Sequence, residues 1–225
     1  MEWRDLDILY EDNHLLAINK PANLLVQGDR TGDRTLLDLA RASLKDRHAK
    51  PGQVYLGLVH RLDRPVTGVI VLARTSKAAG RLSRQFREGL VRKQYLAVVQ
   101  GAPPVGGDEL MHHLAASGDR HGVTRAAVAP FAGSRPARLR YLVTGRAPGR
   151  SRLEIELLTG RRHQIRAQLA LVGWPVLGDV KYGARRESAL AGIALHAWRL
   201  TLDHPVGGAP LHLEAPLPAD WPWQA

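Results

Sequence analysis

Apolar residues fall in short runs along the chain, and the spacing within each run predicts alternating strands and helices. Residues 69–73 are all apolar and follow a turn at Pro65 and Gly68, so they predict a buried strand. Residues 35–45 carry apolar side chains at helical spacing behind Thr35, which predicts a capped helix. Residues 76–90 repeat an apolar side chain every four positions, which predicts a second helix that begins at Ser76.

The second half of the chain follows the same logic without any internal repeat. Short strands are predicted near 123–129, 137–143 and 152–158. A helix is then expected to open at Thr159, a candidate cap, and to end near Gly173 and Pro175. The Pro- and Gly-rich stretch 101–108 reads as a connecting loop.

The charge of the chain favours a polyanionic partner. Of the 225 residues, 44% are hydrophobic and 24% are charged, as in an ordinary globular protein, but the net charge is +11. A basic surface of this size attracts nucleic acid by neutralising phosphates and releasing counterions. Most of the basic residues are Arg, which suits phosphate contacts and base stacking, although a genome rich in G and C explains the same bias.

Several classes of site are not expected. The chain has no Cys, so it can hold neither a disulfide framework nor a thiolate metal site. Only His112, His113 and His121 lie close together, and they lack acidic companions, so we expect surface or loop residues and no metal. The N-terminus lacks the features of a secretory signal and no apolar run approaches 18 residues, so a soluble, cytoplasmic protein with no membrane partner is expected.

The segment from His60 to Gly68 holds the most informative chemistry. If residues 57–63 are extended, Arg61 and Asp63 point to the same face. An aspartate held beside arginine stays ionised, which suits a nucleophile or an electrostatic stabiliser better than a general acid. For an isolated Asp with Arg neighbours, however, a structural ion pair is the commoner interpretation.

This segment resembles the signature of the RluA-type pseudouridine synthases, and further segments of that family follow the same order along the chain. They are residues 8–21, 93–97, 160–166, 177–183 and 195–197. The resemblance runs from about residue 6 to residue 216. It implies an α+β pseudouridine synthase fold, with a mainly antiparallel mixed sheet in two joined halves, flanking helices and a central active-site cleft. One catalytic domain is expected over residues 1–225, with the 101–108 loop inside it and no separate S4 RNA-binding domain in front.

The implied reaction isomerises uridine in ribosomal or transfer RNA, without cofactor or metal, by a protein expected to be monomeric. The resemblance assigns Asp63 as the catalytic carboxylate, Arg166 as its charged partner and Tyr95 as the ring that stacks on uracil. Asp63 could attack the ribose, attack the base or abstract a sugar proton, and the sequence leaves these open. Arg61 is implied to enter the space that the flipped uridine vacates. Without the resemblance, Tyr95 would be read as a half-buried strand residue.

The residues expected to contact RNA are Arg61, Arg64, Arg81, Arg84, Arg162, His163 and Gln164. For Arg81 and Arg84, which share a helix face, a solvated basic surface is the alternative. The chain departs from many relatives at Arg162, where they have a small hydroxyl residue, and at Ala167 and Gln168, where they have Val and His. RNA contacts around that helix are therefore expected to differ.

Two other function classes are compatible with parts of this sequence. A non-catalytic RNA-binding protein or chaperone explains the charge but does not need Asp63, Tyr95 and Arg166 in their motifs. The stretch ending at Asp63 superficially resembles a kinase catalytic loop. The Asn expected five residues later is absent, Gly68 being there, and no Gly-rich phosphate loop precedes it, which argues against a phosphotransferase.

Overall fold

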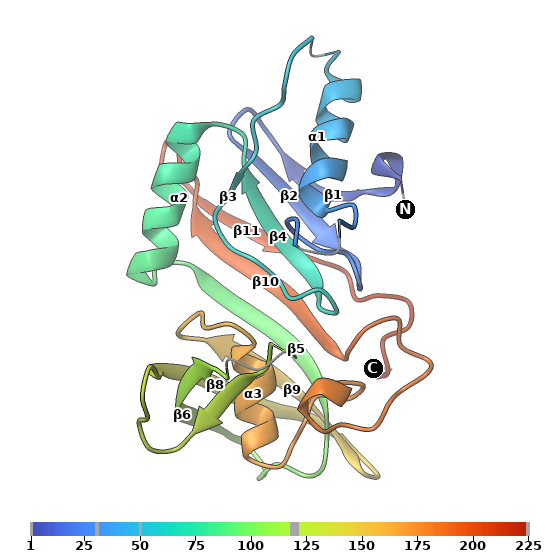
Figure 1. Cartoon of the computed structure of the whole chain (residues 1–225), viewed down its shortest axis with the longest axis vertical. Helices are drawn as coiled ribbons and strands as arrows, with labels where there is room; N and C mark the ends of the chain where they lie inside the picture. Colours follow the sequence, from blue (N-terminus) through green and yellow to red (C-terminus); the bar gives the residue numbers. More distant parts are fainter. Residues whose placement is uncertain (1, 30–31, 50, 118–121, 224–225) are drawn as a thin grey trace. The chain divides into compact units, whose positions relative to one another are not determined.

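The computed structural model describes all of the chain except residues 1, 30–31, 50, 118–121 and 224–225. Its residues fall into two compact units, which Figure 1 shows with labelled elements. Unit 1 comprises Met1–Val91 and Ala197–Pro218, and unit 2 comprises Arg92–His196 and Ala219–Ala225. The expectation of a single catalytic domain stays a prediction. Within the described residues, none of the helices is long and apolar enough to cross a membrane.

Unit 1 combines a sheet with two α-helices. Its elements are η1 (Trp3–Asp5), β1 (Asp7–Glu11), β2 (Leu15–Lys20), α1 (Leu36–Arg47), β3 (Gly57–Leu58), β4 (Thr67–Ala73), α2 (Ser76–Glu88), most of β10 (Leu195–Asp203), and β11 (Pro210–Glu214). The strands run in the order β1-β2-β4-β10, with β3 beside β4 and β11 beside β10. All seven residues of β4 are buried, as its apolar run predicts, because its two faces both pack. On one face Val69 and Val71 join a core with Ala78 and Leu82 of α2.

The two predicted helices of unit 1 are confirmed. Thr35 caps α1 by accepting a hydrogen bond from the N–H of Asp38, whose carboxylate in turn accepts the N–H of Thr35. Helix α2 begins at Ser76 behind the cap Thr75. It ends at Glu88, two residues earlier than predicted, because Gly89 takes a left-handed conformation with φ of 74°.

Of the residues 57–63 that were expected to be extended, only Gly57 and Leu58 form a paired strand, β3. The physical reason lies in the side chain of His60. Its Nε2 accepts the N–H of Val71 on β4 at 2.9 Å, so an imidazole replaces the next backbone partner. The ring also stacks on Phe86 of α2, with centroids 4.6 Å apart.

The strands of unit 2 pair antiparallel, and a helix packs against one of their faces. Its elements are β5 (Arg92–Gln100), β6 (Gly107–Ala116), β7 (Thr124–Ala127), β8 (Arg135–Ala147), β9 (Arg150–Leu157), α3 (Gln164–Leu171) and η2 (Val180–Tyr182). The strands run in the order β5-β9-β8-β6-β7. Ala167 of α3 packs on Leu114 of β6 and Ala137 of β8, and Figure 1 shows the helix lying along these strands.

The helix predicted to open at Thr159 instead begins at Gln164. His163, the residue before it, has a left-handed backbone with φ of 51°, which a helix cannot include. Thr159 serves the preceding loop, where its hydroxyl accepts the N–H of Arg138 at 2.9 Å and bonds the side chain of Gln164 at 2.7 Å. Strands β7, β8 and β9 confirm the three predicted there, whereas β10 and β11 were not predicted.

Candidate active site

Asp63 lies in a short turn between β3 and β4 of unit 1. Its carboxylate side chain is partly exposed, whereas the neighbouring Leu62 is 7% exposed and packs inward. The carbonyl of Asp63 accepts the N–H of Val66 at 3.1 Å, which closes the turn. Arg61 is exposed beside it. The side chain of Asp63 is therefore accessible to solvent, while its backbone is fixed by the hydrogen bond from Val66 and by the packing of Leu62.

A buried lysine fixes this backbone. Lys20 is fully buried, and its Nζ donates to the carbonyls of Pro21 at 2.8 Å, Leu24 at 3.0 Å and Arg64 at 3.0 Å. Burial lowers the pKa of Lys20 to about 7, while the negative charge of Asp63 acts to raise it. Lys20 thus ties the residue after Asp63 to the turn that follows β2.

Gly68 fixes the other end of the turn. Its φ is 111°, and a β-carbon at this position would lie 2.2 Å from the carbonyl oxygen of Ala197 on β10. Only glycine combines this backbone conformation with so close an approach. The strand that follows Asp63 is therefore seated directly against the backbone of its neighbour.

The basic residues predicted to meet RNA in unit 1 differ in their surroundings. Arg64 donates to the carbonyl of Asn23 at 3.1 Å and pairs with Asp33 at 2.9 Å, while remaining exposed. On α2, Arg81 donates to the carbonyl of Pro205. Arg84 is 67% exposed and lies 3.9 Å from Glu88, a weak contact in water. Their RNA contacts stay predictions, and Arg84 is held less by the protein itself than Arg64 and Arg81 are.

Unit 2 carries the other predicted catalytic residues. Tyr95 is half-buried on β5, opposite Ile155 of β9. Arg166 on α3 is 4% exposed and donates Nε and Nη2 hydrogens to the two oxygens of Asp179, at 2.6 and 2.8 Å. Asp179 is 1% exposed, so this is a buried, two-pronged ion pair. The predicted pairing of Arg166 with Asp63 stays a prediction, since the two residues belong to different units.

Tyr182 supports Arg166 from a second direction. The guanidinium carbon lies 5.0 Å from the centre of the tyrosine ring. The hydroxyl accepts the N–H of Thr124 at 2.8 Å and lies 2.8 Å from Nδ1 of His163. Burial raises the pKa of Tyr182, so the phenol stays protonated. His163, predicted to contact RNA, is placed here as a partner of this phenol, and Arg162 beside it is exposed.

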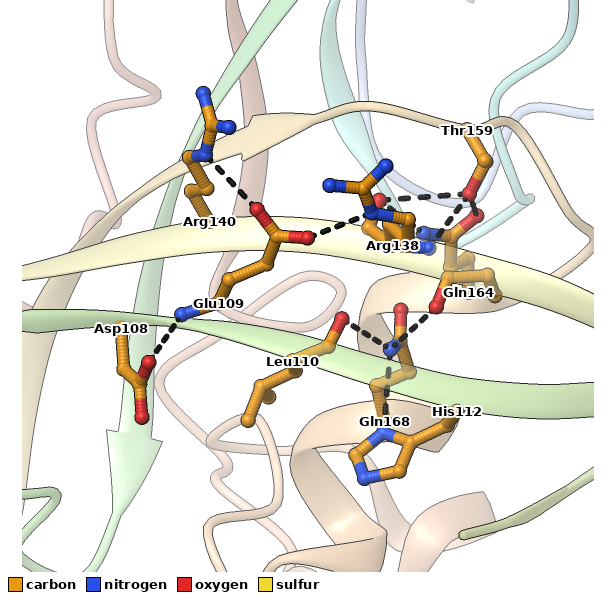
Figure 2. A network of polar contacts seen from close by, with 10 residues as sticks. Asp108, Glu109, Leu110, His112, Arg138, Arg140, Thr159, Gln164 and Gln168 are labelled. Atoms are coloured by element: carbon orange, nitrogen blue, oxygen red, sulfur yellow. Dashed lines mark hydrogen bonds and ion pairs between the residues drawn. The ribbon is translucent and has the colours of Figure 1, made fainter. Parts of the chain in front are cut away.

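Two glutamines anchor α3 to the sheet (Figure 2). Gln164 is buried, and its Nε2 donates to the carbonyl of Arg138 at 3.0 Å. Gln168 is fully buried and donates to the carbonyls of Leu110 and Ala137, at 3.1 and 3.2 Å. This placement favours a structural role for Gln164 over the predicted RNA contact. Gln168, one of the positions where the chain departs from many relatives, therefore anchors the helix and does not lie on its surface.

The expectation that the clustered histidines are surface or loop residues is wrong for His112. It lies within β6, is 6% exposed and contacts Gln168, and burial lowers its pKa. His121 lies outside the described residues. Among the residues that are described, no three His, Asp or Glu side chains gather as metal ligands would. The absence of a metal stays a prediction.

Comparisons with known proteins identify the family of this chain. The family model described as RNA pseudouridylate synthase matches residues 14–171. Ribosomal large subunit pseudouridine synthase D of Nitrosomonas europaea is 38% identical, with 96% of this chain and 63% of the relative covered. The protein of the same name in Pseudomonas aeruginosa is 36% identical, with 97% and 70% covered. The human RNA pseudouridylate synthase domain containing 4 has a TM-score of 0.79 at 26% identity, with 96% of this chain and 90% of that chain covered.

The chain belongs to the RNA pseudouridylate synthase family. The predicted resemblance and the predicted α+β pseudouridine synthase fold are confirmed, and the family is one of RNA-modifying isomerases rather than phosphotransferases. The chain spans about two thirds of the length of its two bacterial relatives. Pattern and spacing assigned no role to Lys20 or Asp179. The signal for Lys20 was a lysine two positions after the apolar run 15–18.

Proposed function

We propose that this chain converts uridine to pseudouridine in RNA of the large ribosomal subunit, with Asp63 as the catalytic carboxylate. The observation that carries the proposal is the way this family member presents Asp63. The acid is partly exposed on a turn that Lys20 and Gly68 hold from both ends. Rigid support of this kind is what a reacting group needs, because a displacement of about 1 Å lowers the rate substantially.

Pseudouridine formation breaks the bond between the ribose and a uracil nitrogen, turns the base, and rejoins it through a ring carbon. An ionised Asp63 can attack the ribose or the uracil ring, or remove a sugar proton and stabilise positive charge on the sugar. Each route needs a carboxylate at a fixed distance and no redox step. Tyr95 supplies a ring for stacking on the free base and a hydroxyl for the final proton removal.

Arg166 is the proposed electrostatic partner of Asp63. Two of the five N–H groups of Arg166 donate to Asp179, and a planar guanidinium can donate to more than one carboxylate. Tyr182 limits rotation of the guanidinium from its face. A preorganised cation of this kind stabilises charge without reorganising during the reaction.

Ribosomal RNA is the proposed target because the relatives in Nitrosomonas europaea and Pseudomonas aeruginosa are named for the large ribosomal subunit. Transfer RNA, left open by the sequence, is the alternative. A ribosomal target would place the enzyme in the cytoplasm. The net charge of +11 supports a polyanionic substrate. The monomeric state stays a prediction.

The test is a map of pseudouridine across ribosomal and transfer RNA from cells with and without the gene. We expect at least one uridine of the large-subunit RNA to lose its modification without the gene and to regain it with the wild-type gene. Loss confined to transfer RNA would contradict the ribosomal assignment. An unchanged map, with RNA still bound by the protein, would favour a non-catalytic RNA-binding protein.

A further inference from the structure

Lys93 shares a strand face with the proposed catalytic tyrosine. It lies two positions before Tyr95 on β5, so their side chains point the same way. The strand β9 lies opposite, and its Ile155 and Leu157 are buried on this face. The lysine is half-buried, and its stem therefore lies on apolar surface next to Tyr95.

No anion neutralises this lysine within the described part of the chain. No ion pair or side-chain hydrogen bond of Lys93 is present there, and burial alone lowers its pKa. This contrasts with Lys20, whose amine has three carbonyl acceptors. A part-buried ammonium without a partner is unfavourable, and such groups gather at functional sites.

The segment nearest to the amine adds positive charge. A β-carbon on Gly160 would lie 3.9 Å from Lys93 Nζ, so the amine lies over the start of the loop that leads to α3. Arg161 follows and donates its Nε hydrogen to the carbonyl of Pro136 at 3.1 Å. Arg162 is exposed. Tyr95 on the strand is neutral in its ordinary protonated form, so these neighbours cannot balance an ammonium.

We propose that Lys93 binds a phosphodiester oxygen of the substrate RNA beside the uridine that stacks on Tyr95. The inference rests on the proposed function and adds a phosphate-binding residue to it. An RNA chain carries one phosphate for every nucleotide, and a compact ammonium on a flexible stem binds phosphate as a point charge. Because Lys93 and Tyr95 share one strand face, the contact fixes the RNA backbone on one side of the reacting nucleotide.

A phosphate at Lys93 leaves a chemical trace. The negative charge raises the pKa of the amine toward its ordinary value, so binding of RNA takes up a proton at alkaline pH. A lysine that only covers apolar surface would show no such uptake. Calorimetry in two buffers with different ionisation enthalpies measures this proton directly.

The experiment compares wild type with Lys93→Met, Lys93→Gln, Lys93→Arg and the control Lys45→Met, which removes an exposed lysine from α1. The probe is an in vitro transcript of large-subunit ribosomal RNA. Both charge-free variants should bind about tenfold more weakly, reduce the slope of log K against log salt by about 0.7 to 0.9, and lose the proton uptake. Lys93→Arg should keep the slope, and Lys45→Met should match wild type.

A Lys93→Met or Lys93→Gln variant that is folded by thermal melting, yet keeps the wild-type slope and proton uptake, would overturn the inference. Two charge-free variants are included because one of them could destabilise the strand. Failure of the Lys93 inference can be distinguished from failure of the proposed function. If wild type binds the transcript but forms no pseudouridine in any RNA, the proposed function fails, while the slope and the proton uptake still decide whether Lys93 meets a phosphate.

Discussion

Lys20 donates a hydrogen bond to the carbonyl of Arg64, the residue that follows Asp63, across 3.0 Å. The position of the proposed catalytic acid is therefore set by a buried amine from β2. This lysine lies far from Asp63 in the sequence. Its other two acceptors, Pro21 and Leu24, belong to the turn after β2. One side chain thus joins two loops that are more than forty residues apart.

Replacing Lys20 by Met should destabilise the fold in a pH-dependent way. Three buried carbonyls lose their donor, at about 1 to 3 kcal/mol for each group left unpaired. The folded pKa of about 7 lies below the ordinary 10.5, so between these values the unfolded chain binds more protons and wild-type stability rises with pH. Urea unfolding at pH 7 and pH 9.5 should show the wild-type advantage growing with pH. If the difference in the free energy of unfolding between wild type and Lys20→Met is the same at both pH values, the pKa of Lys20 is not lowered in the folded protein.

Gly68 should not tolerate even a methyl group. Gly68→Ala places a β-carbon 2.2 Å from the Ala197 oxygen at a φ of 111°, and should lower the free energy of unfolding by about 3 kcal/mol or more. The control is Gly80→Ala on α2, where nothing lies within 4 Å of the new carbon. That change should stabilise by about 0.5 to 1 kcal/mol. Equal effects of the two changes in urea unfolding would show that the close approach at Gly68 is unimportant.

The Arg166 and Asp179 pair should behave as a buried unit. Asp179→Asn leaves a buried guanidinium without its neutralising charge and should destabilise by about 3 to 5 kcal/mol. Glu214→Gln breaks a pair with Arg199 whose side chains are 54% and 42% exposed, and should change stability by less than about 1 kcal/mol. Chemical denaturation of both variants measures the difference. A mild Asp179→Asn phenotype would argue that Arg166 is held by other contacts.

The features that the sequence predicted well are those set by neighbours along the chain. Thr35 has its capping partner three residues away, and most of the buried strand β4 is visible as the five consecutive apolar residues 69–73. The failures involve partners that are distant in sequence. His60 ends β3 because it bonds Val71, and His163 delays α3 because Tyr182 holds its ring.

The candidate site divides in the same way. Asp63 could be singled out because its charged neighbours and its turn are local, and the family resemblance added Tyr95 and Arg166. Lys20 could not be assigned, because its role depends on the carbonyl of Arg64, which only the folded chain brings near. The same is true of the buried contact of Gln164 with the carbonyl of Arg138, and the RNA contact of Gln164 stays a prediction.

Substitutions of two exposed arginines should have different effects if Arg61 positions the uridine and Arg84 binds only phosphate. Arg84→Ala should weaken binding of all RNAs and reduce the slope of log K against log salt by about 0.7 to 0.9. Arg61→Ala should leave affinity nearly unchanged and slow turnover. Its defect should shrink on a substrate whose target uridine is mismatched, because less flipping work remains. Single-turnover rates on both substrates check this, and an Arg61 variant equally slow on both would return Arg61 to a structural role.

The most direct test of the account is single-turnover pseudouridine formation by Asp63→Asn on RNA from cells that lack the gene. The amide keeps the shape of the side chain but removes the charge and the nucleophilicity that every considered route needs. We predict that the variant folds, binds RNA with wild-type affinity and forms no pseudouridine. Activity within about tenfold of wild type, a difference of only about 1.4 kcal/mol in the barrier, would contradict the assignment of Asp63 as the catalytic carboxylate.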